Sequence, residues 1–233
     1  MEVAAAVETR RPIKETPLQR LGRKGRQLLA GLFRLSILAA ILTPVLLFSI
    51  LAIDIPNRSF DHYFSIMRAK PGNWLSNGLL IMALAPFVVI LMSRRFGGEE
   101  ASRVITASWA LTAFAAFAGI SYLSPALEPG DLPNVSFTVA FVLSAIVAQF
   151  TAAGVFDITR GSEAWWRAPF FAALSAFVAS ALIYFPIAFW NSNAPWPNWL
   201  VQYVALTTLM SVVFLGPYKM LMRRLRPRGG FGG

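Results

Sequence analysis

Amide and aromatic side chains are the groups in the apolar segments of this chain that could recognise a ligand. No Asp, Glu, His or Lys falls near the middle of a long apolar segment. Amides can pair with the edge of a neutral planar heterocycle, and aromatic rings can stack on its face. We therefore predict a substrate site built from five residues: Gln149, Gln202, Trp109, Tyr184 and Tyr203.

The same kinds of residue also have an interpretation that needs no ligand. Polar side chains often hydrogen-bond across helix interfaces in membranes, at about 0.6 kcal/mol on average. For Gln149, helix pairing and ligand contact both remain open. Aromatic residues near the ends of spans commonly lie in the headgroup layer. Four tryptophans are assigned to such belts: Trp165, Trp166, Trp190 and Trp199.

The chain offers few groups for catalysis or metal binding. It contains no Cys and one His, His62, and a single imidazole beside Asp61 is not a metal-ligand set. Intramembrane proteolysis, metal-dependent chemistry and proton-relay pumping all need buried ionisable groups. We therefore expect a protein that is not an enzyme and that uses no cofactor and no metal.

The composition indicates an all-α integral membrane protein. Hydrophobic residues make up 56% of the 233 residues and charged residues 14%. A helix that is apolar on all sides belongs in lipid or in the core of a much larger protein. About 20 apolar residues in a helix cross the hydrocarbon layer. Six segments are predicted to do so: 35–53, 75–93, 104–124, 135–156, 168–190 and 199–222.

The basic residues are concentrated on one side of these spans. Of the 21 Lys and Arg residues, 18 lie in alternate segments that include both ends of the chain, and 3 lie in the others. Because basic loops stay in the cytoplasm, we predict that both termini are cytoplasmic. The net charge of +10 therefore comes from basic residues that flank the spans, and we do not interpret it as a nucleic-acid site. The predicted divisions are a basic tail (1–34), a six-helix transmembrane domain (35–222) and a basic, Gly-rich tail (223–233).

Two flanking segments have alternative interpretations. In the N-terminal tail, leucines including Leu21, Leu28 and Leu29 could form an amphipathic helix on anionic lipid, or the tail could simply be solvated. The outer loop 54–73 could close over a site, or it could cover the membrane surface. The Pro-rich segments 125–134 and 191–198 contain no basic residue and are expected to face outward.

Motifs between residues 95 and 218 resemble those of the queuosine precursor transporter family, also called the VUT (vitamin uptake transporter) family. The turn after the second span, Arg95-Phe96-Gly97 followed by Glu100-Ala101-Ser102-Arg103, is similar to the family's turn. So are Trp165-Trp166-Arg167-Ala168-Pro169, Ile187-Ala188-Phe189-Trp190 and Phe214-Leu215-Gly216-Pro217-Tyr218. Gln149 falls where the family has a glutamine, and the resemblance covers roughly residues 75–225.

This resemblance implies a six-helix importer of deazaguanine bases in the bacterial inner membrane. The chain has Ile90, Phe177, Ser180 and Thr207 where the family has charged or amide groups. We therefore expect any cavity between the second, fourth, fifth and sixth spans to be less polar than a deazaguanine site. Either the substrate differs, or the scaffold serves another purpose.

The expected function is import of a small neutral heterocycle, a deazapurine queuosine precursor or a related base. Pro86, Pro186 and Pro217 are predicted to kink the helices at which the bundle bends. The expected partners are the substrate, the lipid bilayer and either a second copy of the chain or an energy-coupling protein. Nucleic acid is not expected. The alternative is a structural or assembly subunit of a larger membrane complex, which would show small-residue interfaces and no central cavity.

Overall fold

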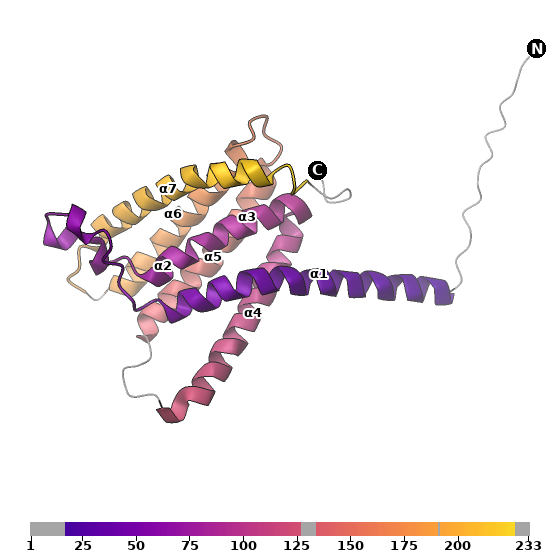
Figure 1. Ribbon diagram of the computed structural model, residues 1–233, viewed down its shortest axis with the longest axis horizontal. Helices are drawn as coiled ribbons and strands as arrows, with labels where there is room; N and C mark the ends of the chain where they lie inside the picture. Colours follow the sequence, from indigo (N-terminus) through magenta and orange to yellow (C-terminus); the bar gives the residue numbers. More distant parts are fainter. Residues whose placement is uncertain (1–16, 127–133, 191, 227–233) are drawn as a thin grey trace, which may run out of the picture.

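The computed structural model is all-helical and describes residues 17–126, 134–190 and 192–226 (Figure 1). Six of its helical segments are long and apolar enough to cross a membrane, which makes the chain a multi-pass membrane protein. In order, the helices are α1 (Pro17–Leu51), α2 (Asn77–Met82), α3 (Leu84–Phe96), α4 (Gly98–Leu123), α5 (Val135–Thr159), α6 (Arg167–Phe189) and α7 (Trp196–Leu221). Glu128 and Asp131, predicted to lie in an outward-facing loop, fall outside the described residues.

The second span is divided into α2 and α3 at Ala83. Pro86 explains the division, because its ring cannot donate to the carbonyl of Met82 and crowds that group. The predicted kink at Pro86 therefore has a visible counterpart. Pro186 and Pro217 lie inside α6 and α7, each of which continues through its proline as one helix.

The first helix starts much earlier than the predicted span. α1 has 35 residues and runs without interruption from Pro17, so the segment before residue 35 is helical in its described part. Near its other end α1 packs tightly on α2 at Gly78. A Cβ atom on Gly78 would collide with the carbonyl oxygen of Ser49 and the backbone of Ile53. Glycine is therefore what allows the two helices to approach this closely.

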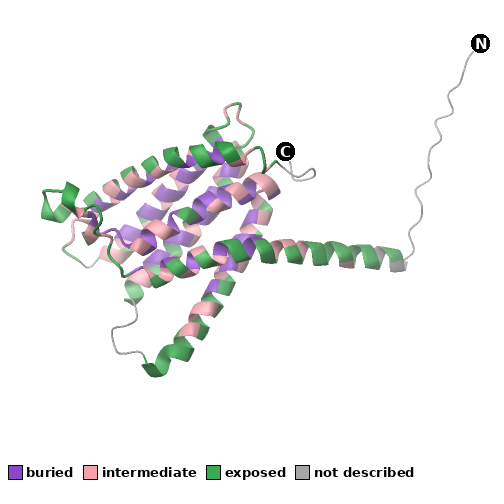
Figure 2. Ribbon diagram, viewed as in Figure 1, coloured by how far each residue is buried: buried purple, intermediate pink, exposed green. Residues whose placement is uncertain are grey.

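The core lies among α3, α5, α6 and α7, where purple buried residues gather in Figure 2. The contact between α5 and α6 is made by small residues, including Ala145 and Ala152 on α5 and Ala172 and Ala176 on α6, all nearly or fully buried. Such small side chains allow two helices to approach closely.

The second half of α4 diverges from this core (Figures 1 and 2). Thr112 is the last buried residue of α4, and Phe114 and Phe117 are exposed. In the small-residue run that begins at Ala113, that residue is exposed and Ala115 and Ala116 are half-buried.

The two ends of the bundle carry different connecting segments. The loop end carries the segment 52–76, which contains the 3₁₀ turns η1 (Asp61–Tyr63), η2 (Met67–Ala69) and η3 (Pro71–Asn73). The basic end carries the turns that join α3 to α4 and α5 to α6. Another 3₁₀ turn, η4 (Ser124–Ala126), follows α4.

Candidate functional site at the loop end

Gln149 and Trp109, two of the predicted site residues, are bonded to each other. Gln149 is completely buried, as expected of an interior residue, and its side-chain oxygen accepts from the indole N–H of Trp109 at 3.2 Å. Its amide nitrogen lies 3.9 Å from the sulfur of Met82, a weak acceptor. The bond joins α4 to α5.

Gln202 has a different tryptophan partner and a different surrounding. Its side-chain oxygen accepts from the indole N–H of Trp74 at 3.1 Å. It lies beside an almost wholly apolar groove of about 320 Å³, which Phe60, Tyr63 and Phe64 of the loop segment also line. The two predicted amides therefore occupy separate places, so a ligand at the groove would not reach Gln149.

The centre of the bundle is nearly filled. Tyr203 is buried there with Phe177 and Ser180 around a gap of about 10 Å³. A cavity needs roughly 10–15 Å³ to hold even one water molecule. The positions where the resembled family has polar groups are thus packed core in this chain, and Ile90 and Thr207 are buried as well.

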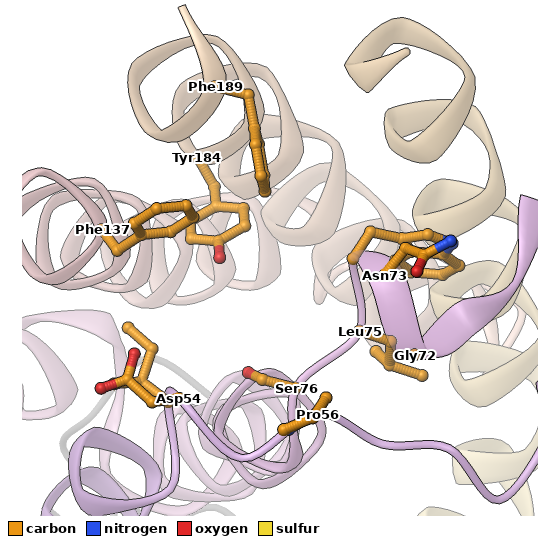
Figure 3. A pocket seen from close by; sticks show the side chains of 11 residues that line it. Asp54, Pro56, Gly72, Asn73, Leu75, Ser76, Phe137, Tyr184 and Phe189 are labelled. Atoms are coloured by element: carbon orange, nitrogen blue, oxygen red, sulfur yellow. The ribbon is translucent and has the colours of Figure 1, made fainter. Parts of the chain in front are cut away.

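A cavity of about 230 Å³, much larger than the gap at the bundle centre, opens at the loop end (Figure 3). Tyr184 and Phe189 of α6 and Phe137 of α5 form one wall. Asp54 and Ser76, from the two ends of the loop segment, form the wall opposite. In Figure 3 the Tyr184 hydroxyl and the Asp54 carboxylate face the same space from these two walls.

Two backbone hydrogen bonds hold the second wall in place. The N–H of Asn57 donates to the carbonyl of Leu75 at 2.7 Å, and the N–H of Asn77 donates to the carbonyl of Ile55 at 2.8 Å. The side chains of Asn57 and Asn77 are also bonded to each other, at 2.7 Å. The residues just after α1 are thereby fixed beside the residues just before α2.

A cluster of aromatic rings separates the loop-end cavity from the filled centre. The Tyr184 and Phe185 ring centroids lie 5.2 Å apart, and those of Phe185 and Tyr203 lie 5.7 Å apart. Trp74, which also lines the cavity, has its ring 6.5 Å from that of Tyr203. These edge and tilted contacts are the preferred geometries of aromatic pairs. Tyr184 is thus at the cavity, while Tyr203 lies behind it.

The outer loop segment packs against the last helix as well. Trp199, predicted to be a belt residue, is instead buried, and its indole N–H donates to the carbonyl of Arg68 at 2.9 Å. Trp190 is exposed, as a belt residue would be. The prediction for Trp199 was wrong. Trp199 lies in the first turn of α7, where its side chain reaches Arg68 of the loop segment, 131 residues earlier in the sequence.

The described residues offer nothing that would hold a metal ion. No three of their His, Asp and Glu side chains come together in one place. His62 lies against the ring of Tyr63, with centroids 3.7 Å apart. The cavity is lined by aromatic rings, the hydroxyls of Tyr184 and Ser76, the Asn73 amide and the Asp54 carboxylate, which suit hydrogen bonding and stacking.

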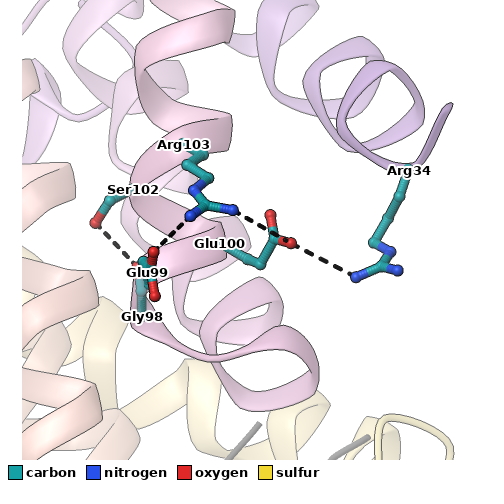
Figure 4. Close-up of polar contacts among 6 residues, drawn as sticks. All are labelled: Arg34, Gly98, Glu99, Glu100, Ser102 and Arg103. Atoms are coloured by element: carbon teal, nitrogen blue, oxygen red, sulfur yellow. Dashed lines mark hydrogen bonds and ion pairs between the residues drawn. The ribbon is translucent and has the colours of Figure 1, made fainter. Parts of the chain in front are cut away.

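The basic end is closed by polar contacts (Figure 4). Gly97 has a φ of 86°, a left-handed conformation that glycine adopts freely, and it separates α3 from α4. The backbone N–H of the next residue, Gly98, donates to the Asp157 carboxylate at 3.2 Å. Glu100 lies 3.6 Å from Arg34 of α1 and 3.9 Å from Arg103 of its own helix. These contacts join α1, α4 and α5.

The last helix is tied to the same end. Arg94 donates to the Tyr218 hydroxyl at 2.9 Å, and Arg95 donates to the carbonyl of Arg224 at 3.2 Å. The Lys219 ammonium lies 5.1 Å from the centre of the Trp165 ring, within the range of a cation–π contact. These contacts of Arg94, Arg95 and Lys219 join α3, the turn before α6 and the end of α7 at the basic end.

Asp54, Phe137 and Phe189 were missed by reasoning from the sequence. Asp54 follows the first span and Phe137 begins the fourth, so neither stands out from ordinary flanking residues. The pairing of the loop ends brings Asp54 to Tyr184, and the packing of α5 on α6 brings Phe137 there.

Comparisons of the chain with protein-family models, with curated proteins and with solved structures find no match.

Proposed function

We propose that this protein imports a small, neutral, planar heterocycle across the bacterial inner membrane. The loop end faces outward and receives the substrate, and the basic end faces the cytoplasm. The observation that supports this most is the loop-end cavity, in which aromatic rings and the polar groups of Tyr184 and Asp54 surround one space.

The size and lining of the cavity suit a small ring compound. Its volume of about 230 Å³ lies below the roughly 300–1,000 Å³ typical of sites for drug-sized ligands. Phe137 and Phe189, whose ring centroids lie 5.2 Å apart, offer apolar faces against which a planar ring can pack. The Asp54 carboxylate can accept N–H donors from the ring's edge, and the Tyr184 hydroxyl can donate or accept.

The resemblance to queuosine precursor transporters supports a deazapurine-like base as the substrate. In this chain the polar contacts would come from the loop end rather than from the bundle centre, because the centre is filled and apolar. A guanine-like edge carries several donors and acceptors, and each one buried without a partner costs roughly 1–3 kcal/mol. Asp54 and Tyr184 would satisfy some of these groups.

The closed basic end and the open loop-end cavity fit one state of an alternating-access cycle. Inward release would require the contacts of Asp157, Arg94 and Arg95 to separate. The apolar spans contain no mid-membrane carboxylate. Facilitated diffusion with metabolic trapping, or coupling to an ATP-driven partner, therefore suits the chain better than proton coupling through the bundle.

Calorimetry on the purified protein tests this assignment. The probe is cyano-deazaguanine, with related neutral bases in parallel. We expect at least one base to bind, and its affinity to fall tenfold or more in Asp54→Ala while persisting in the double variant Gln149→Leu, Gln202→Leu. Affinity lost in the double variant but kept in Asp54→Ala would place the site at the amides instead.

One observation favours the alternative, a structural or assembly subunit. The second half of α4 carries a run of small residues of which none is buried in the described part of the chain, and the bundle centre holds only the gap of about 10 Å³. Small residues of this kind form close helix contacts in membranes. Native mass spectrometry of the protein extracted in mild detergent separates the two functions, because an assembly subunit would carry a stoichiometric protein partner.

A further inference from the structure

The first half of α1 is too long to belong to a membrane span. The helix has 35 residues, which at about 1.5 Å per residue is roughly 52 Å, against a hydrocarbon thickness of about 30 Å. Arg34 lies 3.6 Å from Glu100 in the first turn of α4, where charged groups mark the edge of the hydrocarbon. The residues of α1 before Arg34 therefore continue past the membrane boundary at the basic end.

No described residue in this extension is buried against the bundle. Leu21 is 73% exposed and Phe33 is 70% exposed, and Leu28, Leu29 and Leu32 are exposed as well. Figures 1 and 2 show the extension projecting beyond the other helices as an exposed rod. Five large apolar side chains are thus left uncovered on a segment that the bundle does not protect.

These apolar side chains share one face of the helix. At about 100° per residue, Leu21, Leu28, Leu29, Leu32 and Phe33 fall within an arc of about 140°. Arg23, Gln27 and Arg34 fall opposite, and Lys24 and Arg26 stand near the two borders of the apolar arc. Long basic side chains at such borders can reach up to phosphate groups while their stems lie on apolar surface.

The charges identify the surface that this face meets. Between Pro17 and Phe33 the chain contains basic residues and no Asp or Glu. Helices with one apolar face and a polar face whose charges are all positive typically lie in the headgroup layer of an anionic membrane. The extension begins where the span meets that layer, but α1 is one uninterrupted helix that projects beyond the bundle, so the extension must bend away from the axis of the span to lie on the membrane surface.

We propose that α1 bends close to Arg34 on an anionic membrane, so that the extension, Pro17–Phe33, lies on the lipid surface at the basic end with the leucine face buried between the acyl chains and the headgroups. Anionic lipid attracts each nearby basic residue by about 1 kcal/mol. Removing the charges of Arg23, Lys24 and Arg26 should therefore weaken the lipid-bound state roughly a hundredfold, since about 1.4 kcal/mol is tenfold.

The absence of cysteine makes a direct test possible. Single variants Leu28→Cys and Gln27→Cys carry a nitroxide label, in full-length protein placed in nanodiscs of phosphatidylcholine with an equal amount of phosphatidylglycerol. Collision with oxygen, which concentrates in lipid, is compared with collision with a water-soluble nickel chelate. We expect the label at residue 28 to favour oxygen and the label at residue 27 to favour nickel.

Two matched comparisons define the role of charge. The contrast between the labels should disappear in nanodiscs of phosphatidylcholine alone, and in the triple variant Arg23→Gln, Lys24→Gln, Arg26→Gln. It should persist in a triple variant at the loop end, Arg58→Gln, Arg68→Gln, Lys70→Gln. Equal nickel access at both positions in anionic nanodiscs would overturn the proposal. So would a contrast that is unchanged in neutral lipid, or protection of residue 28 from both reagents, which would mean that protein covers the face.

Discussion

The indole N–H of Trp109 and the side-chain oxygen of Gln149 form a hydrogen bond of 3.2 Å between α4 and α5. The pair lies close to the point at which α4 leaves the bundle, because no residue beyond Thr112 on that helix is buried. The bond therefore joins the diverging helix to the core near its last packed turn.

Gln149→Leu should lower the stability of the protein without abolishing transport. The bond itself contributes about 0.6 kcal/mol, the average for polar pairs in membrane helices, and the Trp109 N–H is left without its acceptor. We expect a total loss of about 1 kcal/mol in reversible unfolding in mixed micelles. Trp109→Phe should show a similar loss, and the double variant little more than either. Lost uptake with unchanged stability would instead make Gln149 a ligand-binding residue.

Gly78→Ala should destabilise the contact between α1 and α2, because the new methyl group meets the backbone of Ser49 and Ile53. Overpacking of this kind costs typically about 1–3 kcal/mol. The matched control is Gly154→Ala on α5, where a Cβ atom meets nothing within 4 Å. Thermal unfolding followed by circular dichroism measures both. Equal midpoints for the two variants would contradict the close approach.

Asp157→Ala should loosen the turn between α3 and α4. It removes the acceptor for the Gly98 N–H and the ion pair with Arg160 at 3.2 Å. A hydrogen bond to a charged group contributes about 1.5–3 kcal/mol, whereas exposed ion pairs contribute about 0–1 kcal/mol. Glu99→Ala, at a side chain that is 83% exposed, is the control and should be nearly neutral. Faster hydrogen exchange at residues 97–101 in Asp157→Ala alone is the expected readout.

Both termini should lie in the cytoplasm, because 18 of the 21 basic residues fall on that side of the predicted spans. A reporter fused to the C-terminus, or inserted after Gly98 or Gly161, should report the cytoplasm. Insertions after Gly130 or Asn193 should report the opposite side. A C-terminal reporter on the outer side would contradict the proposed orientation.

The lengths of the apolar segments predicted the six long helices well, because lipid demands continuous helical hydrogen bonding over a fixed thickness. The helix α1 starts about five turns before the predicted span, in the tail for which an amphipathic helix was one of two interpretations. Hydropathy finds where an all-apolar helix ends, but it does not reveal that a helix continues with one polar face. The division at Ala83 followed from Pro86, which is a local effect of a single residue.

The candidate site was predicted only in part. Tyr184 does line the loop-end cavity, whereas Gln149 and Gln202 bond to different tryptophans in different places. The wall opposite Tyr184 comes from residues such as Asp54 and Ser76, which are unremarkable in sequence. They face the cavity because the close packing at Gly78 and the backbone bonds between residues 55–57 and 75–77 hold the loop ends together. Such long-range pairing leaves no periodic signal in the chain.

Uptake into proteoliposomes by the Asp54→Ala variant tests the proposed transport site most directly. Asp54 is exposed and makes no ion pair or hydrogen bond within the described chain, so its replacement should leave the fold intact. A lost hydrogen bond to a charged group is worth about 1.5–3 kcal/mol, or about tenfold to a hundredfold in affinity. With Phe117→Ala on the exposed face of α4 as control, we predict that uptake of labelled cyano-deazaguanine or a related base falls at least tenfold in Asp54→Ala alone. Uptake unchanged in Asp54→Ala, or absent from the unaltered protein for every neutral base tried, would contradict the account.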